Sequence, residues 1–418
     1  MKGATCLAAI VRDHLRYPSA MRSQPPNRLS LRAPLQRAGS PRLVLVVGLA
    51  LVASLLGACG SDGGLNKADG DASSRNSKVD GPTGKSGVSG VTGTSGAGAA
   101  GTVEIDPVPS AGCASASGVE VPQERRERAA GGLDRWYFLV APPTPSPSVP
   151  RPLIVDYHGY KEGAAVHLKM SAMSELAAGE QFILATPNGT GEAIHWKASA
   201  LAEPSPDNID LAFTDAMIAE ITSEQCVDLA RIYATGLSNG AMMSSLLACS
   251  RSQVFAAVAP VAGITVWKSC DSITPVPVIS FHGTADGFLL YNGGVGDVDG
   301  ILESNQPGQT PVTTVVPPTV LDGAGYPANA KAWATRNGCS GRFVDEAVSP
   351  EVTHRVFDCP AGAEVEFYIV SGGGHAWPGS EFSQAIAPVV GHTTFDIDAT
   401  QLIWSFFQRH ARQLATPN

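Results

Sequence analysis

The sequence predicts an α/β fold, in which a mostly parallel central sheet carries helices on both faces, for one domain over residues 113–418. Short segments rich in Val, Ile and Ala alternate along the chain with segments whose apolar residues recur at helical spacing. The short segments are apolar on both faces, as parallel strands between two helical layers are. Ligands of such sheets bind beyond the carboxyl ends of the strands, so we expect the functional site there.

The alternation of strands and helices runs from residue 135 to residue 412. The helix over 208–222 shows the pattern well, because Phe213, Met217 and Ile221 follow a polar N-terminal cap region at helical spacing. The other expected helices are 165–179, 239–249, 328–337 and 398–412. The expected strands are 135–141, 153–158, 181–187, 230–235, 255–262, 276–282 and 365–370. The Gly- and Pro-rich segment 287–327 interrupts the alternation as an insertion.

The N-terminal segment has the pattern of an export signal. Residues 1–58 contain eight Lys or Arg against one Asp, and an apolar run at 43–56 has the length of a signal-peptide core. The next residues, Leu-Gly-Ala-Cys at 56–59, resemble the lipobox of bacterial lipoproteins, in which the signal is cleaved before a diacylated cysteine. An ordinary signal peptide is the alternative. We expect an exported protein, either secreted or anchored to the membrane of the cell envelope through Cys59.

Composition separates the next segment from the domain and excludes one class of partner. Residues 59–112 are rich in Gly, Ser, Ala and Thr and poor in large apolar side chains, which predicts a disordered tether. The chain carries a net charge of −9, and residues 1–58 carry +7, so the remainder carries −16. A body this acidic repels phosphate backbones, so we do not expect nucleic acid as a partner.

Six cysteines fall within the predicted domain, and in an exported protein they are expected to form three disulfides. Proximity in the sequence favours Cys339–Cys359. The pairing of the other four cysteines stays open. Cys249–Cys270 is preferred, and Cys113–Cys226 is the pair that then remains. No two of the six have the short CxxC spacing of zinc sites, so no metal is expected.

A candidate nucleophile lies at Ser238. Residues 236–240, Gly-Leu-Ser-Asn-Gly, fit the pattern G-x-S-x-G, between the strand at 231–235 and the helix that begins at 239. This is the setting of a nucleophile elbow, in which the two glycines allow a sharp turn that exposes the serine hydroxyl above the sheet. An ordinary tight turn with a surface serine is the alternative.

A serine hydroxyl needs a histidine base oriented by a carboxylate, and in this type of fold the order along the chain is Ser, acid, His. Asp286 follows the strand at 276–282, and His375 follows the strand at 365–370 behind three glycines. His354, His392 and His410 lie in a polar stretch, a loop and the terminal helix, so they fit the base less well. We predict the triad Ser238, Asp286 and His375.

The oxyanion that forms during acyl transfer needs backbone N–H donors. One is expected from Asn239, the residue after the nucleophile, and the other from Tyr160, in the loop that follows the strand at 153–158. The alternative is that His158 and Gly159 merely end a strand. Acyl transfer by this route needs no cofactor.

Five segments together resemble the polyhydroxybutyrate depolymerase and feruloyl esterase family, and its lipoprotein members in particular. They are 233–244, 259–263, 282–286, 337–339 and 373–379, and the likeness extends from about Gly131 to Arg412. The resemblance implies the α/β-hydrolase fold and hydrolysis of carboxylic esters, with Ser238, Asp286 and His375 in the roles given above.

Two departures from that family concern the substrate pocket. Residues 294–327 replace a shorter connection, and they are expected to form a lid or part of the acyl pocket. The family often has Phe-Trp-Asn where this chain has His195-Trp196-Lys197. Trp196 and Trp377 are expected to line the pocket, and a partly buried core or rim indole is the alternative for Trp196.

The expected function is hydrolysis of feruloyl, acetyl or short hydroxyalkanoate esters through an acyl-enzyme intermediate. No polymer-binding module is visible, which favours soluble esters or oligomers over insoluble polyester. A serine peptidase on the same fold and a non-catalytic surface-binding lipoprotein are the alternatives.

Overall fold

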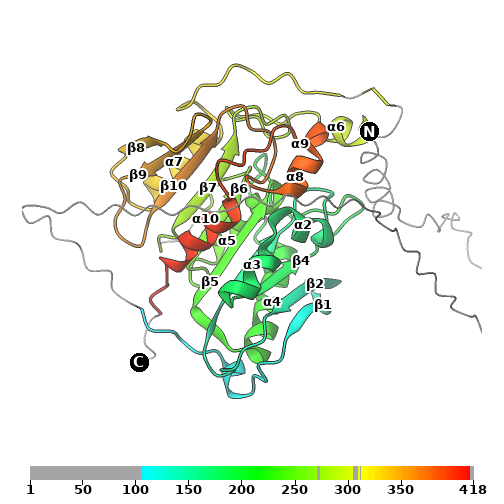
Figure 1. Cartoon of the computed structure of the whole chain (residues 1–418), viewed down its shortest axis with the longest axis vertical. Helices are drawn as coiled ribbons and strands as arrows, with labels where there is room; N and C mark the ends of the chain where they lie inside the picture. The colour runs from blue at the N-terminus through cyan, green and yellow to red at the C-terminus, as the bar shows by residue number, and fades with distance from the viewer. Residues whose placement is uncertain (1–104, 271–273, 305–308, 311, 415–418) are drawn as a thin grey trace, which may run out of the picture. The chain divides into compact units, whose positions relative to one another are not determined.

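The computed structural model describes residues 105–270, 274–304, 309–310 and 312–414. The predicted signal peptide, Cys59 of the predicted lipobox and most of the predicted tether lie outside these residues. Among the described residues, ten strands form one sheet with the order β1-β2-β4-β3-β5-β6-β7-β10-β9-β8 (Figure 1). The strands are β1 (Val121–Ala130), β2 (Leu133–Ala141), β3 (Arg151–Tyr157), β4 (Ile183–Pro187), β5 (Val227–Leu237), β6 (Ala257–Val261), β7 (Val278–Gly283), β8 (Phe343–Ala347), β9 (Val352–Phe357) and β10 (Val365–Val370).

The centre of the sheet is parallel and its two edges are antiparallel. Strands β4, β3, β5, β6, β7 and β10 run in the same direction, so their carboxyl ends meet at one edge of the sheet. Antiparallel pairs add β2 and β1 beside β4, and β9 and β8 beside β10. The predicted α/β-hydrolase architecture, a mostly parallel sheet flanked by helices, is confirmed.

Helices cover both faces of the sheet and divide the core into two clusters. Side chains alternate along β3, where Leu153 and Val155 face one cluster and Ile154 faces the other. Helices α4, α5 and α7 pack in the first cluster, and α2, α3 and α10 pack in the second. The helices are α2 (Ala164–Ser171), α3 (Met173–Glu180), α4 (Ile209–Glu224), α5 (Asn239–Ser250), α6 (Val298–Ser304), α7 (Tyr326–Arg336), α8 (Glu381–Ala385), α9 (Ala387–Val390) and α10 (Ala399–Gln408), with a short 3-10 helix η1 (Ala111–Ala114) before β1.

The helix predicted over 165–179 is two helices, α2 and α3, separated at Ala172. Ala172 adopts a left-handed conformation, with φ 50° and ψ 23°. Just before it, the Ser171 hydroxyl donates to Asp156, and the Ser171 carbonyl accepts from Thr400 on α10. These tertiary contacts fix the chain at a point where the helical pattern of the sequence continues without a break.

Strands β1, β8 and β9 were not predicted from the sequence. Strand β1 lies at one edge of the sheet, reads Val-Pro-Gln-Glu-Arg-Arg-Glu-Arg-Ala-Ala and is largely exposed. Strand β8 lies at the other edge and is also largely exposed, and β9 contains His354 within the stretch described above as polar. Edge strands are held by backbone hydrogen bonds to one neighbour, so they need no apolar alternation, and charged residues protect them from further pairing.

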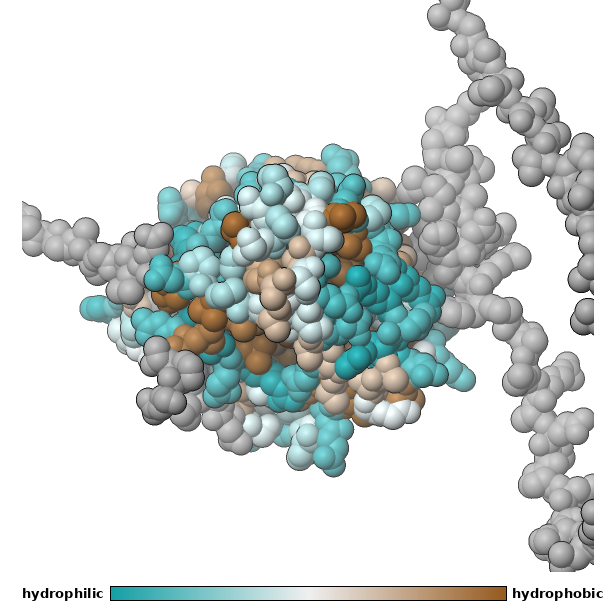
Figure 2. All heavy atoms as spheres, turned by 90° about the horizontal axis from the view of Figure 1, so that it is seen from below, coloured by the Kyte–Doolittle hydropathy of each residue, from teal (hydrophilic) through white to brown (hydrophobic). Residues whose placement is uncertain are grey.

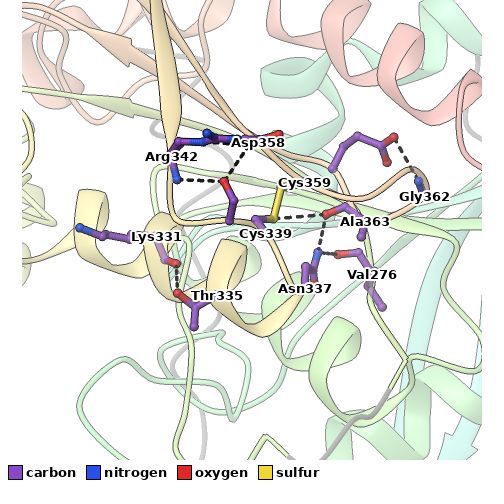
Figure 3. The surroundings of a disulfide bond; sticks show 12 residues. Val276, Lys331, Thr335, Asn337, Cys339, Arg342, Asp358, Cys359, Gly362 and Ala363 are labelled. Atoms are coloured by element: carbon purple, nitrogen blue, oxygen red, sulfur yellow. Dashed lines mark hydrogen bonds and ion pairs between the residues drawn. A yellow bond between two sulfur atoms is a disulfide. The ribbon is translucent and has the colours of Figure 1, made fainter. Parts of the chain in front are cut away.

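Three disulfides link segments outside the sheet. They are Cys339–Cys359, which proximity in the sequence favours, Cys249–Cys270, which is preferred among the open alternatives, and Cys113–Cys226, the pair that then remains. The third joins the end of α7 to the segment after β9, beside Asn337, whose side-chain amide donates to the carbonyls of Val276 and Ala363 (Figure 3). Each pair therefore brings together segments from separate parts of the fold.

The folded part begins before the predicted start at Cys113. The amide of Val108 donates to Asp228, and its carbonyl accepts from Leu229, so residues 105–112 run along the start of β5. These residues belong to the domain rather than to the tether, because they form hydrogen bonds with the backbone of β5 and with the buried carboxylate of Asp228.

The surface seen in Figure 2 is largely hydrophilic, with hydrophobic residues in small patches. The large apolar side chains that are most exposed include Leu201 and Val315, which are 80% and 89% exposed. No helix of the described residues is both long and apolar enough to cross a membrane.

Candidate active site

Ser238 lies at a sharp turn between β5 and α5. Its φ of 59° and ψ of −116° are unusual for a residue with a side chain, and such strain is held only by the surrounding structure. Gly240 and Gly236 allow the turn, because a Cβ atom at either position would lie 2.0 or 2.4 Å from the carbonyl oxygen of Tyr157 on β3. The packing against β3 therefore explains the two glycines of the motif, and the serine is half-buried.

Asp286 and His375 form a hydrogen-bonded pair at the ends of β7 and β10. The distance from His375 Nδ1 to Asp286 Oδ2 is 2.7 Å, and the Asp286 side chain has no exposed surface. The other carboxylate oxygen accepts the amides of Phe288 and Leu289, both at 2.8 Å. Burial raises the pKa of Asp286, but the adjacent His375 outweighs it and the pKa is lowered. Asp286 is therefore an anion that orients the imidazole of His375.

His282 is a second histidine beside Asp286, and it was missed in the sequence analysis. Its Nε2 lies 3.3 Å from Asp286 Oδ2 and 2.9 Å from the carbonyl oxygen of Leu289. Its ring stacks on Tyr326 of α7 at 3.9 Å, and burial lowers its pKa. A neutral His282 donates from Nε2 toward these oxygens and so helps to fix the loop that carries the acid. The sequence feature that could have identified His282 is its position at the end of β7, four residues before Asp286.

Ser238 and His375 line the same cavity, which has a volume of about 630 Å³. Because Nδ1 of His375 is bound to Asp286, Nε2 is the nitrogen left for the serine hydroxyl. Phe288 stacks on the His375 ring at 4.8 Å and limits its rotation. Among the described residues, the Ser238 hydroxyl has no hydrogen-bond partner, and catalytic hydrogen bonds of this kind often tighten only when substrate binds.

The turn from Gly159 to Glu162 follows β3 and leaves one backbone amide free. The Gly159 amide donates to Glu162 Oε2, the Lys161 amide donates to Ile194, and the Glu162 amide donates to Gly159. The Tyr160 amide has no partner among the described residues, and Tyr160 lines the cavity with Ser238. The Asn239 amide, at the first position of α5, is also without a partner within the described part of the chain, as the first amides of a helix are. Tyr160 and Asn239, the two residues predicted to supply oxyanion donors, therefore line the same cavity as Ser238.

The side chain of Asn239 ties the nucleophile turn to the loop after β4. Its Oδ1 accepts the amide of Trp196 at 2.7 Å, and its Nδ2 donates to the carbonyls of Trp196 and Ala198. The Trp196 indole donates to the His158 carbonyl at 2.8 Å. Trp196 is 1% exposed, yet it is also one of the residues that line the cavity, as the sequence analysis expects.

His158 links the turn after β3 to the loop after β4. Its Nε2 accepts the Gly189 amide at 2.8 Å, so the proton is on Nδ1, which donates to the Gly159 carbonyl at 2.6 Å. Burial lowers the pKa of His158 to about 4. This histidine is therefore neutral at physiological pH, and its role is structural, because it joins two loops by hydrogen bonds. The sequence analysis identified this strand end only as the start of the loop that supplies an oxyanion donor.

Comparisons with known proteins identify the family to which this chain belongs. Residues 170–286, which include Ser238 and Asp286, match the model of the prolyl oligopeptidase family. The candidate esterase NocK of Nocardia uniformis is 32% identical over 314 residues, which covers 69% of this chain and 86% of NocK. The chain belongs to the feruloyl esterase-like family of α/β-hydrolases.

Other members of the feruloyl esterase-like family share a shorter region. Feruloyl esterase B of Piromyces equi is 32% identical over 235 residues, 54% of this chain and 39% of that protein. Feruloyl esterase C of Emericella nidulans is 31% identical over 169 residues, 38% of this chain and 58% of that protein. This chain thus covers less than two thirds of the length of either feruloyl esterase. Among solved structures, acetyl xylan esterase from Aspergillus awamori has a TM-score of 0.43 at 15% identity, covering 60% of this chain and 94% of that chain.

The prediction that Trp377 lines the substrate pocket is wrong. Trp377 is 1% exposed and packs in the core between α2 and α10, where its indole donates to Thr400 at 2.9 Å. The indole therefore faces the core rather than the cavity. The insertion does contribute to the cavity, through residues 295–299 and Leu302.

Proposed function

We propose that this protein is a serine hydrolase of carboxylic esters. The observation that carries the proposal is the His375–Asp286 hydrogen bond of 2.7 Å at the wall of a cavity that Ser238 also lines. A serine, an imidazole and a buried carboxylate from three separate loops are the groups that activate a hydroxyl for acyl transfer. Membership of the feruloyl esterase-like family supports ester bonds as the target.

In the proposed reaction, Ser238 Oγ attacks the ester carbonyl carbon while His375 Nε2 takes the hydroxyl proton. Asp286 stabilises the imidazolium that forms, and the amides of Tyr160 and Asn239 donate to the oxyanion of the tetrahedral intermediate. Collapse of this intermediate breaks the bond to the alcohol, which leaves with the proton from His375. Water then attacks the acyl-Ser238 carbonyl carbon while His375 Nε2 takes a proton from the water. The second tetrahedral intermediate collapses, the bond to Ser238 Oγ breaks, and the proton returns from His375 to Ser238 as the acid is released.

Feruloyl, acetyl and short hydroxyalkanoate esters are the proposed substrates. The cavity is lined by apolar side chains, which accommodate an acyl or aromatic group and exclude water from the reacting atoms. These side chains are Val166, Met170, Leu237, Met242, Phe288, Leu289, Leu302, Ile386, Val389 and Val390. A volume of about 630 Å³ is sufficient for a small aromatic acyl group with part of its alcohol.

The experiment that tests this function measures hydrolysis of p-nitrophenyl acetate and butyrate by the full-length protein. Ser238→Ala is expected to abolish turnover, and a fluorophosphonate probe is expected to label Ser238 alone, as mapped by mass spectrometry. Ser223→Ala, which changes an exposed serine of α4, is the matched control and should keep full activity. Labelling of another residue, or turnover that survives Ser238→Ala, would refute the proposal.

A serine peptidase is the second candidate, because the prolyl oligopeptidase model matches residues 170–286. The same triad hydrolyses amides, so the leaving group decides between the two activities. We expect the protein to hydrolyse p-nitrophenyl butyrate and to leave a proline p-nitroanilide peptide intact. Faster release from the anilide would favour the peptidase. A biological role that persists in Ser238→Ala would favour a binding lipoprotein.

We also propose that the protein is exported and lipid-anchored through Cys59. The three disulfides support export, because they persist in oxidising compartments. The lipobox at 56–59 supports the anchor. Cys59→Ser is expected to move the protein from the membrane fraction to the soluble fraction, with Cys6→Ser as the control. Equal membrane association in both variants would exclude the anchor.

A further inference from the structure

A cluster of buried charged side chains lies directly behind the oxyanion loop and has no part in the triad. His167 of α2 lies between Asp156 and Glu162, with Nε2 2.6 Å from Asp156 Oδ1 and Nδ1 3.1 Å from Glu162 Oε1. The side chains of His167 and Asp156 have no exposed surface, and that of Glu162 is 9% exposed. Ser171 donates to the second oxygen of Asp156 at 2.6 Å.

The charges of this cluster compensate one another. Burial lowers the pKa of His167, but the carboxylates of Asp156 and Glu162 outweigh burial and raise it to about 10. For Glu162, burial raises the pKa, and the adjacent His167 outweighs burial and lowers it. A cationic His167 therefore lies between two carboxylates. Burying such a cluster stabilises a fold little or not at all, so a positional role is the better explanation for it.

Glu162 connects this cluster to the turn that carries the Tyr160 amide. Oε1 faces His167, whereas Oε2 accepts the Gly159 amide at 2.5 Å. The Glu162 amide donates back to the Gly159 carbonyl, which closes the turn, and the Lys161 amide is bound to Ile194. A Cβ atom at Gly159 would lie 3.5 Å from the Cβ of Ser238, so the turn packs directly on the nucleophile.

We infer that Glu162, held by His167 and Asp156, is a positioning residue that keeps the Gly159–Glu162 turn in the conformation that directs the Tyr160 amide at the oxyanion. The inference rests on the proposed ester hydrolase function. Glu162 lines the cavity but is bound to the Gly159 amide, so its effect on the oxyanion passes through the Tyr160 donor. Because the oxyanion exists only in the transition state and intermediates, loss of Glu162 should lower kcat and leave KM nearly unchanged.

The test compares Glu162→Ala and Glu162→Gln in the full-length protein with p-nitrophenyl butyrate. Glu162→Ala is expected to lower kcat on the order of 10²-fold, the loss associated with one oxyanion donor, with KM changed less than about threefold. It should weaken binding of an alkyl trifluoromethyl ketone, which forms a tetrahedral adduct with the serine, by a similar factor. Glu162→Gln keeps a carbonyl oxygen for the Gly159 amide and is expected to recover most of kcat.

Glu364→Ala is the matched control, because it removes another carboxylate that pairs with a histidine, His410, at 2.9 Å and outside the cavity. It should lower the melting temperature and leave kcat unchanged. If Glu162→Ala does not fold, Glu162→Asp replaces it, since the shorter side chain cannot reach Gly159 and His167 together and should lose kcat likewise.

An unchanged kcat and an unchanged ketone affinity in a folded Glu162→Ala or Glu162→Asp protein would overturn the inference, as would a change in KM alone. In that case the wild-type protein still hydrolyses the ester and the proposed function stands. If the wild-type protein hydrolyses no ester and no probe labels Ser238, the proposed function fails and the inference fails with it.

Discussion

Nδ1 of His375 and Oδ2 of Asp286 lie 2.7 Å apart, and this carboxylate also accepts two backbone amides from its own loop. The loop hydrogen bonds fix the carboxylate, and the carboxylate in turn fixes the tautomer of the imidazole. The orientation of the base is thus determined by a segment 89 residues away in the sequence.

Asp286→Asn is expected to lower kcat on the order of 10⁴-fold, because an amide stabilises the wrong tautomer of His375 and cannot stabilise its cation. The side chain keeps its shape and one acceptor for the Phe288 and Leu289 amides, so the melting temperature should change little. The measurement is kcat with p-nitrophenyl butyrate. Asp215→Asn, which removes an exposed ion pair with Arg251, is the control and should retain wild-type kcat.

Asn239→Ala is expected to raise KM more than it lowers kcat. The substitution keeps the backbone amide of residue 239 but removes three hydrogen bonds to the loop that holds Trp196. Because polar backbone groups of that loop lose their partners, the free energy of unfolding should fall by about 1–3 kcal/mol. Steady-state kinetics and urea unfolding measure the two effects. A loss of kcat with KM unchanged would contradict the structural role of this side chain.

Gly240→Ala should prevent folding of the domain or leave it inactive, since the new Cβ would lie 2.0 Å from the carbonyl oxygen of Tyr157. Neither backbone can move without displacing β3 or Ser238. Gly179→Ala is the control on helix α3, where the added Cβ meets no atom within 4 Å. It is expected to stabilise the protein by about 0.5–1 kcal/mol. Thermal unfolding and soluble yield compare the two variants, and a folded, active Gly240→Ala protein would disprove the close packing at the elbow.

Acid should destabilise the protein through His158, whose pKa burial lowers from 6.5 to about 4. Between these two pH values the unfolded chain binds a proton that the folded protein does not, so stability falls as the pH falls through this range. The loss is roughly 3 kcal/mol. Urea unfolding between pH 7 and pH 4.5 measures it. His158→Gln should show a shallower pH dependence, and equal slopes in both proteins would argue against a buried neutral His158.

The local pattern of the sequence predicted most of the central sheet and the residues at its carboxyl edge. Ser238 could be placed because a buried strand, a glycine pair and a helix adjoin it in the sequence, and Asp286 and His375 because each follows an apolar strand. The disulfide Cys339–Cys359 followed from proximity. These features depend on local steric and hydrophobic effects, which a single sequence records.

Other features could not be predicted because they depend on contacts between distant segments. Trp377 adjoins the predicted base, yet its indole finds Thr400 of α10 and lies in the core. The break at Ala172 and the edge strand β1 likewise have no local signal, because tertiary hydrogen bonds produce them. His282 and Glu162 were missed in the sequence analysis. Their side chains contact Asp286 and the Gly159 amide, and the packing of the fold alone determines the directions of these side chains.

The sequence by itself determined the class of fold, the order of the triad along the chain and the strand-turn-helix setting of Ser238, because these follow from periodicity, glycine positions and residue chemistry. The tertiary structure decided which side chains share the cavity, which amide of the turn after β3 is free, and which histidines are neutral or charged. The physical reason is that burial and hydrogen bonding depend on every segment packed around a group, and those segments come from across the whole domain.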